Sequence, residues 1–332
     1  MPALLLSRLL STCALTLAVA AVTVLGGCGP LDDIESQQHA VADCRGAPYP
    51  IVLAHGMAGW DKLGPLNYFF NVAGDLRAHG NTVVEARVSP FEPSAARARQ
   101  LGAYVDETLR NTGACKVVLI GHSQGGLDAR YLVSSLHYGD RVAAVVTVAT
   151  PHRGSKVADA VSGLIPGFGY DLINGLLKAV GVLVGAPGEP NLKAQLQQLS
   201  SESMLHRFNP ANPDDPRVRY YSVAGRTALK RGDDECKGGL WPNSSRVDLL
   251  DALFVVPAGV FSLTSPNPLD PVAHDGLVSV EAAKWGRFLG CVPADHLDEI
   301  GQFVHLLADP FSGYEHKGMY RKIVDQLRAD GF

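Results

Sequence analysis

The chain has 332 residues, of which 46% are hydrophobic and 19% are charged, and its formal net charge is −4. This composition is typical of a globular protein with enough apolar mass for one large core. The charge is too small to indicate a partner, and the absence of a basic patch argues against binding to nucleic acid.

The N-terminal residues predict export. Arg8 precedes an uncharged run, residues 9–27, that is rich in Leu, Ala and Val, and a basic start before an apolar segment is typical of a signal peptide. The run is long for such a segment, so an uncleaved membrane anchor is the alternative. The run leads into "LGGC" at 25–28, which resembles a bacterial lipoprotein signal with Cys28 as the acylated residue. A plain secretory signal is the alternative at this position.

We therefore expect residues 1–27 to be a signal peptide of the lipoprotein type. The polar, unpatterned residues 28–46 are expected to be a flexible tether, and residues 47–332 the folded domain. The protein would be anchored at the cell envelope through Cys28, or otherwise secreted.

Four cysteines remain beyond the signal and the acylation motif, an even number that suits an oxidising compartment. They are Cys44, Cys115, Cys236 and Cys291. Cys44 and Cys115 each precede an expected strand. If those strands are parallel and close together, the pairs are Cys44–Cys115 and Cys236–Cys291; free buried thiols are the alternative.

From about residue 47, apolar strand-like runs alternate with helical patterns. The expected strands are 50–56, 81–88, 116–120, 143–150 and 217–225, and the expected helices are about 65–79, 94–111 and 124–137. Continuous apolar strands separated by helices predict an α/β fold whose mostly parallel sheet is covered on both faces.

Residues 157–186 interrupt this alternation with a Gly-rich, apolar, helix-like stretch. Asp159, Pro166, Asp171 and Lys178 argue against a transmembrane span. The stretch is either an ordinary pair of core helices or an apolar flap over a site. Its position directly after a candidate catalytic strand–helix unit favours the flap.

The motif G-x-S-x-G occurs at residues 121–125, "GHSQG". Alone it would arise by accident in about one chain in ten of this length. Here it follows a buried strand and precedes a helix, which is the context of a nucleophile elbow. Such a turn is tight, so the residues two before and two after the serine must lack bulk. Ser123 is the candidate nucleophile.

A serine hydroxyl needs a base to accept its proton and an anion to hold that base. On this type of sheet the expected order along the chain is serine, acid, histidine. The candidate histidines are His152, His206, His274, His296 and His305. Asp275 and His296 fit the order best; Asp270 and His305 are the alternatives.

Two backbone N–H groups must bind the oxyanion that forms during acyl transfer. One is expected from Gln124, at the start of the helix, where the dipole helps. The other is expected from Met57, in the loop after the first strand, where Gly56 allows the backbone to turn inward.

Five stretches together resemble the calcium-dependent triacylglycerol lipases of Gram-negative bacteria, members of the α/β-hydrolase fold. They are "PIVLAHGMAGWDKLG", "VVLIGHSQGGLDARYL", "VTVATPHRGSKVAD", "HDGLVSV" and "DHLDEIGQ", in the family's order over most of 48–308. The resemblance implies a triad of Ser123, Asp275 and His296, with Met57 and Gln124 as oxyanion donors. It also implies a lid, about residues 157–208, that opens at an oil–water interface.

The resemblance further implies a structural calcium ion near the histidine loop. The matching ligands are Asp298 and the backbone carbonyls of Gln302 and Leu306, with an upstream aspartate, Asp248, for which Asp251 is the alternative. Oxygen ligands suit calcium. The competing interpretation is that Asp298 and Glu299 are a solvated helix start. Many relatives also need a membrane-bound folding chaperone.

We therefore expect an exported serine lipase that acts on acylglycerols through an acyl-enzyme on Ser123. A carboxylesterase or phospholipase that uses the same triad without interfacial gating is the alternative. A non-catalytic lipid-binding protein on a hydrolase scaffold is a remote third possibility.

Overall fold

The computed structural model describes residues 48–57, 59, 67–183, 191–227, 235–236, 239–241, 254–266, 271–302 and 313–332. The predicted signal peptide, the acylation site Cys28, the tether and Cys44 therefore lie outside the described residues. Within the described part of the chain, none of the helices has both the length and the apolar character needed to cross a membrane.

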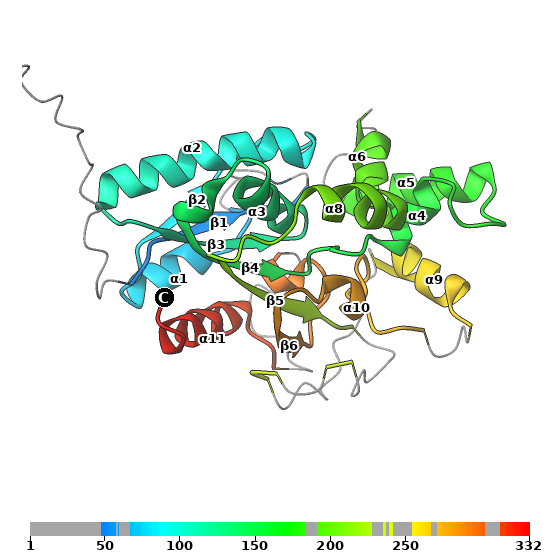
Figure 1. The fold of residues 1–332 in the computed structure, drawn as a ribbon. Coiled ribbons are helices and arrows are strands. Elements are labelled where there is room, and N and C mark those ends of the chain that lie inside the picture. The colour runs from blue at the N-terminus through cyan, green and yellow to red at the C-terminus, as the bar shows by residue number, and fades with distance from the viewer. Residues whose placement is uncertain are drawn as a thin grey trace, which may run out of the picture. The chain divides into compact units, whose positions relative to one another are not determined.

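A six-stranded sheet forms the centre of the fold, with the order β2-β1-β3-β4-β5-β6 and every neighbouring pair parallel (Figure 1). The strands are β1 Ile51–Ala54, β2 Val83–Ala86, β3 Val117–His122, β4 Val142–Val148, β5 Arg219–Gly225 and β6 Arg287–Val292. All five strands predicted from the sequence are confirmed, and so is the α/β fold class. β6 was not predicted.

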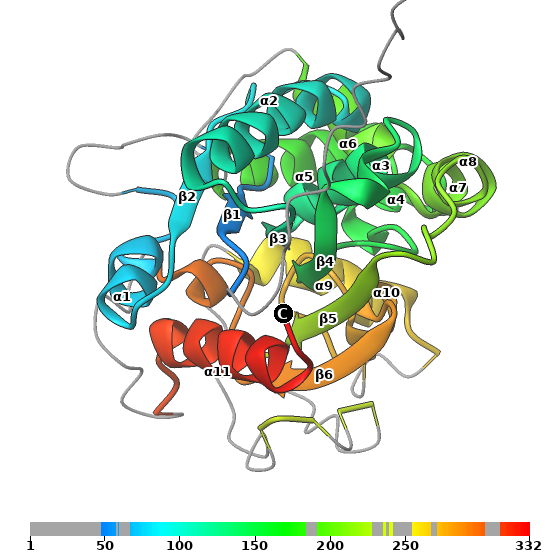
Figure 2. The same ribbon diagram turned by 60° about the vertical axis from the view of Figure 1, so that its left-hand side comes forward.

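Helices cover both faces of this sheet (Figure 2). The short helix α1 and the C-terminal helix α11 lie on one face, and α2 and α3 lie on the other. Their bounds are α1 Val72–Ala78, α2 Ser94–Thr112, α3 Gln124–Ser134 and α11 His316–Ala329. α1 begins seven residues later than expected, whereas α2 and α3 lie where the sequence predicts them. Because both faces are covered, strands such as β4 are buried along their whole length.

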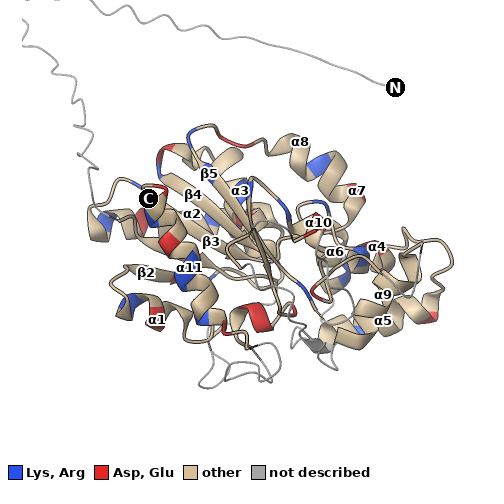
Figure 3. Cartoon of the chain, turned by 90° about the horizontal axis from the view of Figure 1, so that it is seen from below, with Lys and Arg blue, Asp and Glu red and all other residues tan. Residues whose placement is uncertain are grey.

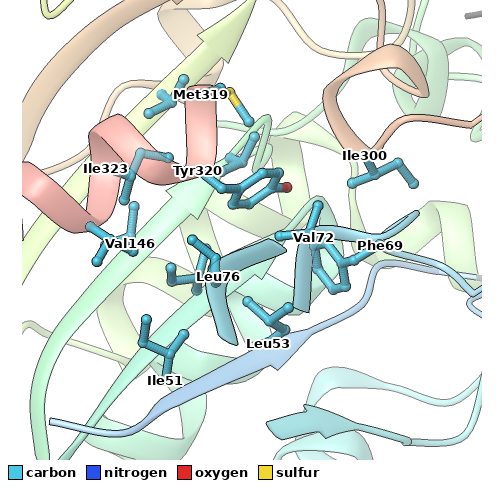
Figure 4. Close-up of a cluster of buried hydrophobic side chains, with 14 of the residues drawn as sticks. Ile51, Leu53, Phe69, Val72, Leu76, Val146, Ile300, Met319, Tyr320 and Ile323 are labelled. Carbon is cyan, nitrogen blue, oxygen red and sulfur yellow. The ribbon is translucent and has the colours of Figure 1, made fainter. Parts of the chain in front are cut away.

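One core cluster fills the space between the sheet and the pair α1 and α11 (Figure 4). Leu53 and Val146 project from the strands, and Leu76 of α1 meets them. Tyr320 of α11 packs edge-on against Phe69 with ring centroids 6.0 Å apart. This packing fixes the sheet against which the site is built.

The strand order creates a switch point between β1 and β3. The chain leaves β1 towards β2 on one side, and then crosses back through α2 to β3 on the other side. Connections that diverge from neighbouring strands leave a crevice at the carboxyl ends of those strands. The loop after β1 and the turn after β3 both lie at this end of the sheet.

A group of helices packs at the carboxyl end of the sheet around a separate apolar cluster. They are α4 Lys156–Val161, α5 Tyr170–Leu183, α6 Leu192–Gln198 and α9 Val255–Thr264. The apolar stretch 157–186 thus contains nearly all of α4 and all of α5. Figure 3 shows that α9 carries no charged side chain. Leu127 of α3 joins the same cluster, so this layer rests on the helix that follows Ser123.

Short elements complete the described part of the chain. They are the helical segments α7 Ser201–Ser203, α8 Asn209–Ala211 and α10 Val280–Ala283, a π-helical turn Met204–Phe208, and the 3₁₀ turns Tyr138–Asp140 and Asp298–Ile300.

A disulfide joins Cys236 to Cys291 of β6, which confirms the predicted pair. Cys115 is also disulfide-bonded. Because Cys44 lies outside the described residues, the pair Cys44–Cys115 stays a prediction.

Candidate active site

Ser123 lies in a sharp turn between β3 and α3. Its φ of 53° and ψ of −126° are unusual for a residue with a side chain. The turn is held at both ends of the residue. The N–H of Ser123 donates to Val148 O (2.9 Å), and its carbonyl accepts from the Thr150 hydroxyl (2.8 Å). The end of β4 and the residues directly after it therefore hold the strained residue in place.

The glycines around Ser123 are required by close backbone approach. A Cβ on Gly121 would lie 2.5 Å from the backbone N of Gly126, and one on Gly125 would lie 2.6 Å from the carbonyl of His55. Atoms at these distances overlap. The structure thus supplies the reason for the small residues that the motif has two places before and two places after the serine.

Asp275 and His296 are hydrogen-bonded side chain to side chain. Nδ1 of His296 lies 2.7 Å from Oδ2 of Asp275, and the backbone N–H of His296 donates to the carbonyl of Asp275 (2.9 Å). The second carboxylate oxygen accepts the N–H groups of Leu277 (2.8 Å) and Val278 (2.6 Å). With Nδ1 carrying the hydrogen that faces Asp275, Nε2 is the ring atom available to accept a proton.

The other candidate residues are arranged differently. His274 stacks on Phe261 of α9 with ring centroids 4.2 Å apart, and its Nδ1 accepts the N–H of Gly276. His152 is buried beside Arg130, and His206 is exposed on the π-helical turn. Asp270 and His305 lie outside the described residues.

His122 directly precedes Ser123 in the chain, and its ring centroid is 4.6 Å from that of His296. Nε2 of His122 lies 3.2 Å from Oε2 of Glu299, and Nδ1 is hydrogen-bonded to the Tyr68 hydroxyl (2.8 Å). Sequence analysis assigned no role in the site to Tyr68, His122 or Glu299. His122 occupies the variable position of the motif, and nothing in the sequence indicates that it meets a side chain 177 positions later.

Burial and neighbouring carboxylates govern the charge of this network. Glu299 is 0% exposed, and burial, followed by the nearby Asp275, Asp295 and Asp298, raises its pKa well above the usual range. Burial, and then the neighbouring His296, holds the pKa of His122 well below 6.5. Both shifts favour the uncharged forms of Glu299 and His122.

Gln124 is the first residue of α3, where the N–H groups have no partner within the helix. Its side chain is held on both sides. Gln195 of α6 donates to Oε1 of Gln124 (2.7 Å), and Nε2 of Gln124 donates to Glu92 O (3.1 Å). Met57 packs against the apolar cluster of α4, α5, α6 and α9. Both predicted oxyanion residues therefore contact the helices at the carboxyl end of the sheet. Gln124 does so through Gln195 of α6, and Met57 through the apolar cluster.

The implied calcium site can be tested only at Asp298 and Gln302, because Asp248, Asp251 and Leu306 lie outside the described residues. Asp298 is 4% exposed and Glu299 is fully buried, so the competing expectation of a solvated helix start is wrong. The side-chain amide of Gln302 donates to the carbonyls of Asn67 (2.6 Å) and Tyr68 (2.7 Å). These bonds hold Gln302, whose backbone carbonyl is the expected calcium ligand. A buried carboxylate in an acidic loop fits a divalent cation with oxygen ligands.

A second group of possible metal ligands consists of His122, His296 and Glu299, which each place one ligand atom within 4.8 Å of the others. Two imidazoles in three ligands are unsuited to calcium. This group is therefore not the implied calcium site.

Comparisons with known proteins agree with the geometry. The α/β hydrolase fold family matches residues 49–209. The triacylglycerol lipase of Vibrio cholerae is 32% identical over 85% of this chain and 88% of its own length. The triacylglycerol lipase of Burkholderia plantarii is 39% identical over 50% of this chain and 48% of its own. The crystal structure of a Bacillus licheniformis lipase is similar in fold, with a TM-score of 0.58 at 18% identity, over 84% of this chain and 92% of its own.

Proposed function

The chain belongs to the bacterial lipases of the α/β-hydrolase superfamily, and we propose that this ester hydrolase acts on triacylglycerols. The names of the Vibrio and Burkholderia relatives support this substrate class. The observation that carries the chemistry is the 2.7 Å hydrogen bond between His296 and Asp275, next to the strained turn that bears Ser123.

In the proposed reaction, Oγ of Ser123 attacks the ester carbonyl carbon while Nε2 of His296 accepts the hydroxyl proton. The N–H groups of Met57 and Gln124 bind the resulting oxyanion. The carbon–oxygen bond to the alcohol then breaks, and His296 returns the proton to the departing oxygen. A water molecule, deprotonated by His296, then attacks the acyl carbon; the bond to Oγ of Ser123 breaks, His296 returns the proton to Oγ, and the fatty acid is released. Asp275 holds the Nδ1 hydrogen and stabilises the imidazolium.

Residues 157–208, together with α9, are proposed to be a lid at the lipid–water interface. Large apolar side chains are exposed on this layer, which is unusual for a surface in contact with water alone. Tyr170 is 79% exposed on α5, and Val255 is 58% and Leu263 65% exposed on α9. Hinged movement of such a layer would uncover Ser123 and the apolar side chains on the inner side of its helices.

The loop after His296 is proposed to bind calcium through Asp298 and the carbonyl of Gln302, with Asp248 and Leu306 as the remaining ligands. When bound, the ion would neutralise part of the negative charge of the loop. His296, the proposed base, is two residues before Asp298 in this loop. Holding the loop is therefore the expected effect of the ion on the reaction.

Export and anchoring through Cys28 are also proposed. The disulfide between Cys236 and Cys291 supports folding in an oxidising compartment. A membrane-bound folding chaperone remains part of the same proposal. The mass of the mature N-terminal peptide tests the anchor, because acylated Cys28 would carry the mass of its lipid.

The nucleophile is tested by covalent labelling with a fluorophosphonate, followed by peptide mass spectrometry. Wild type is expected to carry the label on Ser123 and to hydrolyse a soluble short-chain ester. Ser123→Ala is expected to lose the label and several orders of magnitude in kcat. Ser135→Ala is the control. It removes a hydroxyl at the C-terminal end of α3 that donates to Asn212. Full activity in Ser123→Ala, or a label elsewhere, would contradict the assignment.

A further inference from the structure

The carbonyl oxygen of Gly56 accepts hydrogen bonds from three directions. Nδ1 of His55 lies 2.8 Å away, Nη2 of Arg97 lies 3.2 Å away, and the backbone N of Gly59 lies 3.3 Å away. A carbonyl oxygen has two lone pairs and commonly takes one or two donors. The peptide unit between Gly56 and Met57 is therefore held unusually firmly for a loop.

Holding this carbonyl also orients the next N–H. In a planar trans peptide, the carbonyl and the following N–H point in opposite directions. The carbonyl of Gly56 points towards Arg97 and the His55 ring, so the N–H of Met57 faces away from them. The residue that begins this peptide unit lies against the nucleophile, because a Cβ on Gly56 would be 2.9 Å from the Cβ of Ser123.

Arg97 uses its guanidinium to join several segments around this loop. Nη2 donates to the carbonyls of His55 (2.6 Å) and Gly56 (3.2 Å), and Nη1 donates to Ser89 O (2.7 Å). Nε donates to Oδ2 of Asp128 (2.7 Å). Asp128 lies on α3, one turn after Gln124, so Arg97 links the loop after β1 to the helix that carries the second expected oxyanion donor.

Arg97 and Asp128 form a buried ion pair. The side chain of Arg97 is 0% exposed and that of Asp128 is 1% exposed. A buried ion pair is often replaceable by apolar residues without loss of stability. A guanidinium that donates in a fixed planar fork is harder to replace, because lysine offers no matching geometry. The arrangement suits a residue that sets backbone positions.

The tautomer of His55 follows from its second contact. The backbone N–H of Val88 donates to Nε2 of His55 (3.2 Å), so Nε2 is an acceptor and carries no hydrogen. In the neutral ring Nδ1 then carries the hydrogen and donates it to Gly56 O. Burial, and then the charge of Arg97, lowers the pKa of His55 to about 4, which agrees with a neutral ring at pH 7.

We propose that Arg97, with His55, is a positioning residue that aims the N–H of Met57 at the oxyanion, and that Asp128 fixes Arg97 relative to Ser123. This inference rests on the proposed function. Arg97 and His55 act through the backbone carbonyls that they bind. Their effect would appear in the stabilisation of the tetrahedral intermediate and not in the binding of the ester.

Arg97→Lys is compared with Arg130→Lys, a buried arginine on α3 that bonds to Asn209 and Asn212 instead. kcat and KM are measured on a soluble ester, together with the inhibition constant of a boronic acid, which forms a tetrahedral anion on a serine nucleophile. For Arg97→Lys we expect kcat to fall by about 10- to 100-fold, somewhat less than the loss of a whole oxyanion donor. KM should change by less than about threefold, and the boronic acid should bind more weakly by the same factor as kcat/KM falls. Arg130→Lys should keep both constants near wild type.

A second pair of variants covers the case in which Arg97→Lys does not fold. His55→Asn retains a side-chain N–H close to the place of Nδ1, whereas His55→Leu has no donor. We expect His55→Leu to lose kcat and boronic acid affinity together, and His55→Asn to recover most of both.

Two outcomes separate this inference from the proposed function. If wild type neither hydrolyses the ester nor takes up a fluorophosphonate, the proposed function fails. If wild type is active but Arg97→Lys or His55→Leu keeps its kcat and its boronic acid affinity, only the positioning role is overturned. A change confined to KM, or equal losses in Arg130→Lys, would also overturn it.

Discussion

The two carboxylate oxygens of Asp275 have separate tasks. Oδ2 faces Nδ1 of His296, while Oδ1 accepts two backbone N–H groups from the turn that follows. The backbone bonds fix the carboxylate, and the carboxylate fixes the ring. Because Oδ1 is fully used by the turn, the orientation of the histidine depends on Oδ2 alone.

Asp275→Asn should therefore keep the fold and lose activity. The amide can retain an acceptor oxygen for the turn, but its NH₂ group would face Nδ1 of His296 and favour the wrong tautomer. We expect kcat to fall by about 10²- to 10⁴-fold with little change in Tm. Steady-state kinetics and thermal unfolding measure the two effects. Wild-type kcat in a folded Asp275→Asn protein would contradict the assignment of the acid.

His152 belongs to a buried polar cluster away from the proposed reaction. The Arg130 guanidinium lies 3.7 Å above the Trp285 ring, and the His152 ring stacks on the same indole. Nη1 of Arg130 donates to Nδ1 of His152 (3.3 Å), so Nε2–H of His152 donates to the Thr147 hydroxyl (3.0 Å). Burial, and then the charge of Arg130, holds the pKa of His152 well below 6.5.

This shift makes stability depend on pH. Between the folded pKa and the ordinary value of 6.5, the unfolded chain binds a proton that the folded protein excludes, so stability rises with pH. The contribution is complete above about pH 6.5 and is lost as pH falls below it. His152→Gln should reduce the slope of unfolding free energy against pH by up to about 1.4 kcal/mol per pH unit. Denaturation at several pH values measures this slope, and equal slopes in both proteins would contradict the shift.

At the residue scale, the sequence predicts the groups that share a motif and misses those that meet only in space. Ser123, Asp275 and His296 each stand in a recognisable local context. His122, Glu299 and Arg97 do not, because their roles depend on partners 31 to 177 positions away. No local propensity reports such a contact.

At the scale of elements, the strands β1 to β5 were predictable because they are continuous apolar runs. β6 was missed because Gly290, with φ of 121°, interrupts a run that begins with exposed Arg287. α9 was missed because its ten residues include Pro257 and Gly259 and lack the polar face that identifies a surface helix. α9 packs against the apolar helices α4 and α5, and its sequence does not show the amphipathic pattern of a surface helix.

The disulfide between Cys236 and Cys291 restrains a long segment that contains Asp275. Its cysteines are 55 positions apart, and closing a loop of that size removes about 4 kcal/mol of chain entropy from the unfolded state in the loop model. The double variant Cys236→Ser with Cys291→Ser should lose about this much unfolding free energy in denaturant titrations. A loss below about 1 kcal/mol would show that the bridge adds little to the fold.

At the scale of the whole molecule, calcium is expected to act on stability before it acts on chemistry. An ion that binds only the folded state at a hundredfold excess over Kd adds about 2.7 kcal/mol, or roughly 5 °C in Tm for a chain of this size. A chelator should therefore lower the Tm of wild type but leave Asp298→Ala unchanged. Asp171→Ala, an exposed aspartate on α5, is the control and should respond like wild type. A wild-type Tm that ignores the chelator would contradict the calcium site.

The whole fold places a rigid site under an apolar layer. The triad candidates and the loop after β1 are fixed by hydrogen bonds from neighbouring turns and from buried side chains, whereas the layer of α4, α5, α6 and α9 presents exposed apolar side chains. This arrangement predicts that the catalytic groups are always in place and that access of the substrate to them depends on a lipid surface.

The most direct test is the rate of hydrolysis of a medium-chain triglyceride by the mature protein, with calcium present, across the solubility limit of the substrate. The account predicts a sharp rise in rate once an emulsion forms, and no activity in Ser123→Ala on either side of the limit. A flat rate with soluble-ester activity would contradict interfacial gating and favour a carboxylesterase or phospholipase. Triglyceride hydrolysis by Ser123→Ala at the wild-type rate would contradict the central claim itself.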